Sequence, residues 1–523
     1  MHKRQSLARM SAGLLRPPRG GIRWVATTGM AAVVVAACGS TSTASPPSTA
    51  KPPSTLSIGI PAPVETLDPI DTASVGNDES LLADLYATLV QKSASGKLEP
   101  DIATNWKLVN PTTWQFNLRK DVHFWNGDLF TASDVAYNIA RVQNPANNSR
   151  NASYYADVTG VTEPSKFVAD IHTKTPDLTL PDALSFFYLL DPSWVPTHSP
   201  ATQAMGDGPY KLVSYNAESE VVMDANPTYF GSQPYFKTVT YVVLPSASAQ
   251  LDAIESGQVD VMTSFSVDEI SELEKDPSIM VGHYSSSFAY MIKINTLTSP
   301  TSNLDVRLAM NYAVNKAAIA KSILDGVVSP SPGELLQPIY QGYDPSLSAY
   351  PYDPAKAKSL LASAGYAHGL SVTFMVPTGT YPSDTAISEA VAQQLGQVGI
   401  KATIDELPFD TYLQDYVTKR TLSPVSFLGQ SWATLTCEGL FGLFVSASPY
   451  AYWTDTAFTN AVNSALAATS TSQANADCAQ AASIMRSQAP VIFLFPEPVV
   501  YAIRKGIAWT PNPAGWLLGY AFH

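Results

Sequence analysis

The sequence predicts an α/β protein made of two lobes, and three stretches carry that prediction. In the middle of the chain, residues 288–295 alternate apolar and polar side chains as a strand does, and apolar residues then recur at three- and four-residue steps over 305–326, as on a packed helix. On either side, helical patterns lead directly into strand-like runs, at 246–261 and at 384–404. Because similar lengths of this α/β pattern lie before and after the middle stretch, we place the passage from one lobe to the other there.

The first 37 residues have the composition of an export signal. They contain six lysines and arginines and no acidic residue, and residues 24–37 form an apolar run. This run is shorter than the ~20 residues that a membrane-spanning helix needs, which disfavours a transmembrane anchor. Small residues precede Cys38 as in a bacterial lipobox. We therefore expect a signal peptide over 1–37, lipidation of Cys38 and anchoring to the outer face of the cell membrane; a plain secretory signal is the other alternative.

A polar spacer and an acidic body follow the signal. Residues 38–55 are mostly Ser, Thr, Pro and Ala, a composition typical of a disordered linker. About 470 residues remain, enough for two or more hydrophobic cores. The whole sequence has a formal charge of −13, and without the six leader cations 25 Lys and Arg face 44 acids, which gives −19. So acidic a chain is not expected to bind nucleic acid or anionic lipid surfaces.

Two cysteines remain once Cys38 is assigned to lipid. Cys437 and Cys478 could form a disulfide in an exported protein, and two separate buried thiols are the alternative. The sequence shows no Cys/His cluster at metal-ligand spacing, so we expect neither a metal nor a cofactor.

The elements of the first lobe are predicted from alternation and helix caps. Residues 56–60 form the first strand, and a loop of small residues at 70–77 precedes a helix over 79–91. Between 101 and 205 we expect short strands and one helix, which begins at the capping box of residues 131–134. The remaining elements complete a mainly parallel sheet covered by helices: strands at 206–213, 221–223, 239–244 and 259–261, a helix at 246–257 and a capped helix at 266–269.

The second lobe repeats the same pattern. Asp353 and Pro354 provide the cap and first turn of a helix that runs to Ala364, and the strand at 370–376 follows it. The helix over 384–397 has one apolar face, ends before Gly399, and leads into a strand over 400–404.

Motifs of one known family occur along the chain in that family's order. Asn295 and Thr296, followed by residues 304–316, resemble the "NT…DVRxAxxxAxxR/K" segment of the family 5 extracellular solute-binding proteins, the peptide- and nickel-type receptors of ABC importers. The resemblance extends over about residues 56–510, with further matching segments at 66–69, 85–90, 100–106, 116–135, 206–212, 253–261 and 353–357.

The resemblance implies an α/β, two-lobed periplasmic-binding-protein-like fold of type II, in the large cluster with an inserted subdomain in the first lobe. Two passages between the lobes, at 290–300 and 493–503, would make a hinge about which the lobes close on a ligand. The boundaries we expect are 56–90 and 208–292 for the first lobe, 91–207 for the inserted subdomain, 293–495 for the second lobe, and 496–523 for a return to the first lobe.

The same resemblance implies ligand-binding positions. Ser74 and Val75, in the small-residue loop, match a loop that touches the ligand in similar peptide receptors, although a plain connection is the alternative. Tyr154 and Tyr155 follow an Asn/Ser-rich loop, where a tyrosine lines the cleft in related receptors; we expect Tyr155 in that role, and a core or surface tyrosine is the alternative. Residues 430–435 resemble an edge strand that pairs with the ligand backbone. In that segment we expect contacts from Ser431, Trp432, Ala433 and Thr434, and a core role is the alternative for Trp432.

Two charged anchors of the family's peptide site are missing from this sequence. The acid that clamps a ligand's α-amino group usually stands three residues after the tryptophan, where this chain has Leu435. Gly429 stands where an arginine is often found. A buried ammonium without a partner costs several kcal/mol. Either Glu438 therefore supplies the acid, or the ligand has no free amino group.

We expect a binding protein rather than an enzyme, because the sequence shows no catalytic constellation. The expected role is that of a monomeric receptor that captures a peptide or peptide-like solute and delivers it to the permease subunits of an ABC importer. The alternatives are the same role for an amine-free solute, such as a glycan, a metal chelate or another metabolite, and a secreted enzyme.

Overall fold

The structure of the protein is a computed structural model that describes residues 54–71 and 77–523. The expectations for the signal peptide, for Cys38, for nearly all of the linker, and for Ser74 and Val75 lie outside the described residues. Among the residues that are described, no helix is both long and apolar enough to span a membrane.

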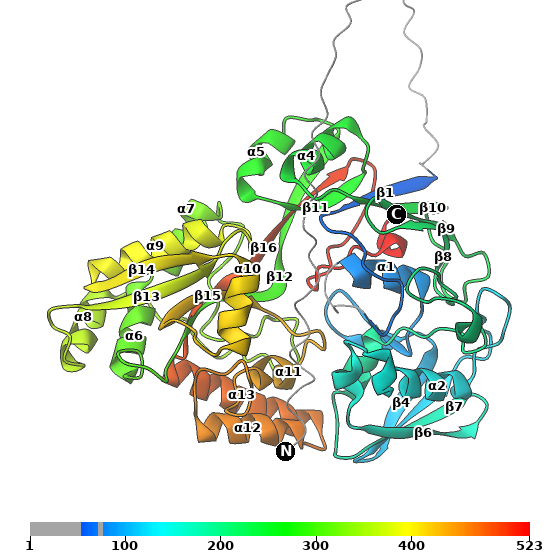
Figure 1. Cartoon of the computed structure of the whole chain (residues 1–523), viewed down its shortest axis with the longest axis horizontal. Coiled ribbons are helices and arrows are strands. Elements are labelled where there is room, and N and C mark those ends of the chain that lie inside the picture. The colour runs from blue at the N-terminus through cyan, green and yellow to red at the C-terminus, as the bar shows by residue number, and fades with distance from the viewer. Residues whose placement is uncertain (1–53, 72–76) are drawn as a thin grey trace, which may run out of the picture. The chain divides into compact units, whose positions relative to one another are not determined.

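A sheet of ten strands runs through both lobes, in the order β14-β13-β15-β12-β16-β11-β1-β10-β9-β8 (Figure 1). The expectation of a mainly parallel sheet is wrong. Four neighbouring pairs are parallel and five are antiparallel, because β8, β9 and β10 form a meander and two long strands cross between the lobes. The strands are β1 (Thr55–Ile60), β8 (Tyr210–Asn216), β9 (Glu220–Ala225), β10 (Thr238–Val243), β11 (Val261–Phe265), β12 (Ile279–Ile294), β13 (Leu370–Pro377), β14 (Ile400–Leu407), β15 (Val425–Gln430) and β16 (Val491–Arg504).

The two passages between the lobes are the long antiparallel strands β12 and β16. The first strand overlaps the stretch 290–300 and the second contains the stretch 493–503, where the passages are expected. The pairing of the two strands shifts register between Ser285 and Ala289, opposite Pro498 and Pro496. At this break the hydroxyls of Ser286 and Tyr290 donate to the two carboxylate oxygens of Glu497, at 2.9 and 3.1 Å.

Several helices confirm the sequence predictions, and two correct them. The helix expected over 79–91 ends at Leu85, because the following main-chain N–H groups of Ala87 and Thr88 donate to Asp207 and Asp101 instead. The helix expected over 305–326 is two helices, which an extended Val314 separates. The longer helices are α1 (Asn77–Leu85), α4 (Ala247–Ser256), α6 (Leu304–Ala313), α7 (Lys316–Ile323), α8 (Pro354–Ser363), α9 (Asp384–Gln397), α12 (Thr456–Leu466) and α13 (Thr471–Gln488).

A separate four-stranded sheet forms in the stretch where the inserted subdomain is expected. Its order is β4-β5-β7-β6, and the capping box at Thr131 starts its helix α2 (Ala132–Gln143), as predicted. The apolar face of α2 packs into the same hydrophobic core as β1 and α1. The strands are β4 (Ala103–Asn110), β5 (Thr113–Leu118), β6 (Val158–Ser165) and β7 (Val168–Thr173).

Two polar residues of the central motif, Asn295 and Arg307, form hydrogen bonds that connect segments of the second lobe. Asn295 donates its side-chain amide to the carbonyl of Leu422 at 2.8 Å. The buried guanidinium of Arg307 donates to three main-chain carbonyls, including that of Gln488 at the end of α13. These contacts give the motif a folding role, because they satisfy carbonyl groups that would otherwise be buried without a donor.

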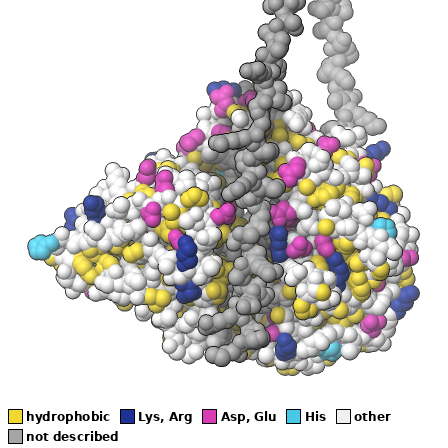
Figure 2. All heavy atoms as spheres, viewed as in Figure 1, with side chains coloured by type: hydrophobic (Ala, Val, Ile, Leu, Met, Phe, Trp, Pro, Cys, Tyr) yellow, Lys and Arg dark blue, Asp and Glu magenta, His cyan; other side chains and the backbone are white. Residues whose placement is uncertain are grey.

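Charged side chains are dispersed over the described part of the face shown in Figure 2. On the face shown in Figure 2, acidic and basic side chains are interspersed among the described residues, and no large basic patch gathers there. This distribution agrees with the net charge of −13 and gives no electrostatic footprint for nucleic acid on that face.

Candidate functional site

The loop that follows β15, residues 431–436, lies where the two lobes meet. The sequence analysis expected an edge strand here, and that expectation is wrong: β15 ends at Gln430 and is an internal strand between β13 and β12. The main-chain N–H of Trp432 donates to the hydroxyl of Tyr340 at 2.9 Å, and its carbonyl accepts from the N–H of Leu435 at 2.9 Å. The backbone of the 431–436 loop is therefore held by its own lobe in a turn.

The structure explains why the acid three residues after the tryptophan is absent. Leu435 has φ +51° and is only 5% exposed, so the turn directs its side chain into the second-lobe core. Its carbonyl accepts from the N–H of Gln341 at 2.9 Å. A carboxylate at this position would be buried among apolar side chains, at a large desolvation cost.

Gly429 is fixed by an aromatic neighbour. A Cβ atom at this position would lie 2.8 Å from the ring of Tyr381, whose hydroxyl donates to the carbonyl of Gly429 at 3.1 Å. The ring of Tyr290 would be 3.2 Å away on the other side. An arginine does not fit here, because two tyrosine rings cover the position.

Rings from both lobes meet at Trp432. The ring of Tyr154 lies 5.8 Å from that of Trp432, centroid to centroid, and Ala433 packs against the first-lobe core. The sequence analysis assigned the cleft position to Tyr155, and the structure corrects this. Tyr155 is 0% exposed and its hydroxyl donates to the carbonyl of Ala183, so it belongs to the core, and its neighbour Tyr154 faces the second lobe.

Lys92, at the end of β2 (Val90–Lys92), makes a buried polar contact between the lobes. Its ammonium lies 2.8 Å from a carboxylate oxygen of Asp182, in α3 (Leu180–Ala183), and the two side chains are 4% and 7% exposed. The same ammonium donates to the main-chain carbonyl of Thr434. A first-lobe cation is thus bonded to the 431–436 loop.

Glu438 lies just beyond this loop, in the first turn of α11 (Cys437–Gly442). It is 4% exposed, and its Oε2 atom has no hydrogen-bond partner. Burial raises the pKa of this carboxyl, and the nearby carboxylates of Asp182 and Asp177 raise it further. Asp182, Asp177 and Glu438 thus bring three carboxyl groups together at the lobe contact, where Lys92 forms an ion pair with Asp182.

A disulfide joins Cys437, at the start of α11, to Cys478 of α13, with Cα atoms 6.1 Å apart. This is the pair that the sequence analysis expected. Gly342, with φ +89°, packs against it so closely that a Cβ would lie 2.7 Å from the Cβ of Cys437. Glu438 is also close to both sulfur atoms, but two sulfurs bonded to each other offer no thiolate ligands to a metal.

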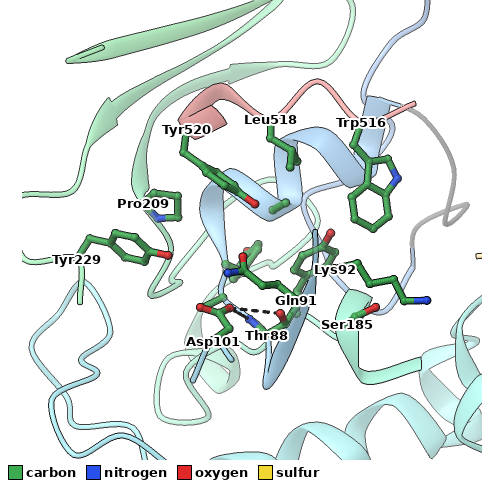
Figure 3. A pocket seen from close by; sticks show the side chains of 14 residues that line it. Thr88, Gln91, Lys92, Asp101, Ser185, Pro209, Tyr229, Trp516, Leu518 and Tyr520 are labelled. Carbon is green, nitrogen blue, oxygen red and sulfur yellow. Dashed lines mark hydrogen bonds between the residues drawn. The ribbon is translucent and has the colours of Figure 1, made fainter. Parts of the chain in front are cut away.

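A small polar cavity lies in the first lobe, beside Lys92 (Figure 3). Its floor carries Thr88 and Asp101, which are hydrogen-bonded to each other, and burial raises the pKa of Asp101 to about 6. Its roof is the C-terminal tail, including Trp516 and Tyr520, which the buried carboxylate of Asp84 holds through the N–H groups of Gly519 and Tyr520. Trp516, Leu518 and Tyr520 of the C-terminal tail therefore line this cavity together with residues of the first lobe.

The sequence analysis did not predict Lys92, Asp182 or Tyr340, and it preferred Tyr155 to its neighbour Tyr154. No spacing signal connects them, because Lys92 and Thr434 are separated by 342 residues and Tyr340 and Trp432 by 92. Glu438 is predicted from the sequence because it is an acid close to position 435, where the acid of the family's peptide site is missing.

Comparisons with known proteins agree with this architecture. The family model of the bacterial extracellular solute-binding proteins, family 5 Middle, matches residues 97–452. The dipeptide-binding protein of Escherichia coli is 25% identical over 469 residues, 82% of this chain and 87% of that protein. Heme-binding protein A of Haemophilus influenzae is 26% identical over 349 residues, 61% of this chain and 63% of that protein. The solved structure of the periplasmic murein tripeptide binding protein MppA, in its unliganded open form, matches with a TM-score of 0.79 at 21% identity, over 90% of this chain and 98% of that one. The fold is therefore the α/β fold of periplasmic binding proteins.

Proposed function

The chain belongs to the bacterial extracellular solute-binding proteins of family 5, and on that premise we propose that it captures a short peptide or peptide-like solute for an ABC importer. As a member of a family of binding proteins, it is not an enzyme. In our proposal the solute lies between the lobes, and the monomeric receptor delivers it to the permease subunits. The 25% identical dipeptide-binding protein supports a peptide as the first choice.

The observation that carries this proposal is the buried carboxylate of Glu438. Its Oε2 atom has no partner, and burial raises its pKa, because an unpaired buried charge costs several kcal/mol. A ligand ammonium would stabilise the charged form of Glu438. In the family's peptide site, an acid at the position of Leu435 pairs with the ligand's α-amino group in the same way. We therefore propose that Glu438 is the amine partner.

The other proposed contacts surround this carboxylate. We propose that Trp432 covers a ligand side chain and that Ser431, Ala433 and Thr434 contribute to the same wall, and the family resemblance adds Ser74 and Val75 as proposed contacts. Tyr154 replaces Tyr155 in this proposal, because Tyr154 packs on Trp432. The ligand would be held mainly by side chains, since the N–H and carbonyl of Trp432 already have partners within the second lobe.

The second candidate is an amine-free solute. It is favoured by Leu435 and Gly429, whose surroundings leave no room for the two charged anchors, and by the similarity to a heme-binding protein. In that case Glu438 stays protonated, which burial promotes by raising its pKa.

We also propose that the exported protein is tethered by lipid. The signal over 1–37 would be cleaved before Cys38, and the linker over 38–55 would carry two lobes with the boundaries expected above. Cys38→Ala should abolish labelling of the protein by a radioactive fatty acid in its host. Continued labelling of this variant would contradict the lipid anchor.

The ligand proposal is tested by thermal unfolding of the purified protein with a library of di-, tri- and tetrapeptides. Binding to the folded state raises the midpoint with peptide concentration. We expect a saturable rise for a subset of peptides with free amino groups. No rise for any peptide, combined with a rise for a heme-like compound, chelate or glycan, would establish the second candidate instead.

A further inference from the structure

Lys92 has surroundings that differ from those of Lys97, the other lysine of its hairpin. It ends β2, and the turn to β3 (Leu98–Pro100) carries the exposed Lys97. The side chain of Lys92 is 4% exposed and extends past Ser185 and Trp516, away from Asp101 and the centre of the first-lobe cavity (Figure 3). Lysine is seldom buried unless its charge is paired, so this position requires specific partners.

Its two partners belong to different lobes. Asp182 of the first lobe holds the ammonium at 2.8 Å, and the main-chain carbonyl of Thr434 in the second lobe accepts another of its hydrogen bonds. Val90, two residues earlier, is part of the first-lobe core, while Leu435, next to Thr434, is part of the second. The bond to Thr434 therefore exists only while the lobes are together.

The contacts of Lys92 favour a link between the two lobes over an ion pair that acts within the first lobe alone. An ion pair of Lys92 and Asp182 pays a large desolvation cost when it is buried, and further hydrogen bonds to the remaining ammonium protons offset that cost. The Thr434 carbonyl supplies such a bond from the other lobe. The Tyr154 and Trp432 rings also meet between the lobes, so an aromatic contact and a hydrogen bond both reach the 431–436 loop.

We propose that Lys92 is a positioning residue that ties the 431–436 loop of the second lobe to the first lobe and favours lobe closure. The proposal goes beyond the receptor role and does not depend on the identity of the solute. A hydrogen bond from a charged donor, lost when the lobes separate, corresponds to roughly a ten- to hundred-fold change in the ratio of closed to open protein.

Hydrogen–deuterium exchange of the exported protein tests the tie, with no solute added. In Lys92→Met, the amides of the 431–436 loop should exchange roughly ten- to hundred-fold faster than in the wild type. Lys97→Met is the matched control and should leave the loop unchanged, because Lys97 lies in the exposed turn of the same hairpin.

The variant Asp182→Asn distinguishes the hydrogen bond between Lys92 and Thr434 from the ion pair between Lys92 and Asp182. This variant breaks the ion pair but leaves Lys92 able to bond to Thr434, so the loop should be accelerated clearly less than in Lys92→Met. Wild-type exchange at 431–436 in Lys92→Met would overturn the proposal. So would faster exchange confined to residues 90–100 and 180–183, which would assign Lys92 a role within the first lobe alone, or equal acceleration of the loop by both variants, which would attribute the effect to the ion pair rather than to the bond to Thr434.

Discussion

The hydroxyl of Tyr340 accepts the main-chain N–H of Trp432 at 2.9 Å, so a buried tyrosine fixes the residue whose ring faces the other lobe. Burial raises the pKa of Tyr340, while its contacts to Trp432, Ser431 and Ser287 lower it in part. Ser287 lies in the irregular stretch of β12 where the strands that cross between the lobes shift register. Tyr340 therefore contacts both the 431–436 loop and the hinge.

Tyr340→Phe should loosen the loop without unfolding the lobe. The variant keeps the ring but removes the acceptor of the Trp432 N–H, and we expect the free energy of unfolding to fall by about 0.5–1.5 kcal/mol. Exchange of the Trp432 amide should accelerate, as measured by hydrogen–deuterium exchange. Tyr352→Phe is the control, because Tyr352 is exposed. An unchanged Trp432 amide in Tyr340→Phe would show that the hydroxyl does not hold the loop.

Glu438→Gln should discriminate between peptides by their amino terminus. We expect free-amine peptides to bind more weakly by ~1 to 3 kcal/mol, the range for a hydrogen bond to a charged group, and N-acetylated peptides to be affected much less. Isothermal titration calorimetry measures both. Glu406→Gln, at an exposed position, serves as the control. Equal losses for free and acetylated peptides would dismiss Glu438 as the amine partner.

The disulfide should stabilise the second lobe. Closing a loop over a separation of 41 residues contributes roughly 3 to 4 kcal/mol in the chain-entropy model, so a reductant should lower the urea midpoint of the exported protein. The sequence contains only one further cysteine, Cys38, which makes the shift attributable to this bond. Mass spectrometry of a non-reduced digest should find the Cys437 and Cys478 peptides linked. Two free thiols, or a midpoint that does not respond to reductant, would contradict the prediction.

Lys293 should contribute stability that rises with pH above neutrality, opposed between pH 7 and 8 by Asp207 and Glu334, whose pKa values burial raises to about 8. Burial lowers the pKa of Lys293 to about 7, and its ammonium contacts the Tyr416 hydroxyl at 2.8 Å and the Phe444 ring at 4.1 Å. In the unfolded chain its pKa is about 10.4, so between pH 7 and 10 the unfolded state binds more protons, and the free energy of unfolding rises with pH. The rise from this group is roughly 3 kcal/mol.

Lys293→Met tests this assignment, since methionine keeps the length of the side chain without a titrating group. Its urea denaturation should show a smaller increase in stability from pH 7 to 10 than the wild type, with a remainder from Lys316, whose pKa burial lowers to about 8. Lys401→Met, at an exposed position, should keep the wild-type slope. A wild-type slope in Lys293→Met would show that Lys293 does not titrate in this range.

Local patterns predicted those elements whose signals are local. The helix over 384–397 matches α9 at both ends, and Ser246 and Gly257 cap α4 as expected, because caps and apolar periodicity act within a few residues. The break at Val314 could not be predicted in the same way. Asn315 begins a new helix there, and its main-chain N–H donates to Gln394, 79 residues later.

The candidate site was only partly predictable, for a related reason. The resemblance directed attention to Trp432 and Glu438, but the local conformation at Leu435 depends on Gln341 and on the second-lobe core. Tyr154, and not Tyr155, contacts the second lobe, because Tyr155 packs in the first-lobe core while Tyr154 packs on Trp432. Both contacts join segments that are far apart in the sequence. Contacts between distant segments of this kind leave no periodic signal in either segment.

Native mass spectrometry of the protein purified from its own host tests the central claim most directly. We predict that the wild-type protein carries a non-covalent small solute with the mass of a short peptide, which is released on denaturation. The double variant Trp432→Ala and Glu438→Gln should carry much less of it, while its fold, checked by circular dichroism, stays intact. A wild-type protein that carries no solute and binds no peptide, or a peptide that the double variant retains in full, would contradict capture of a peptide at this site.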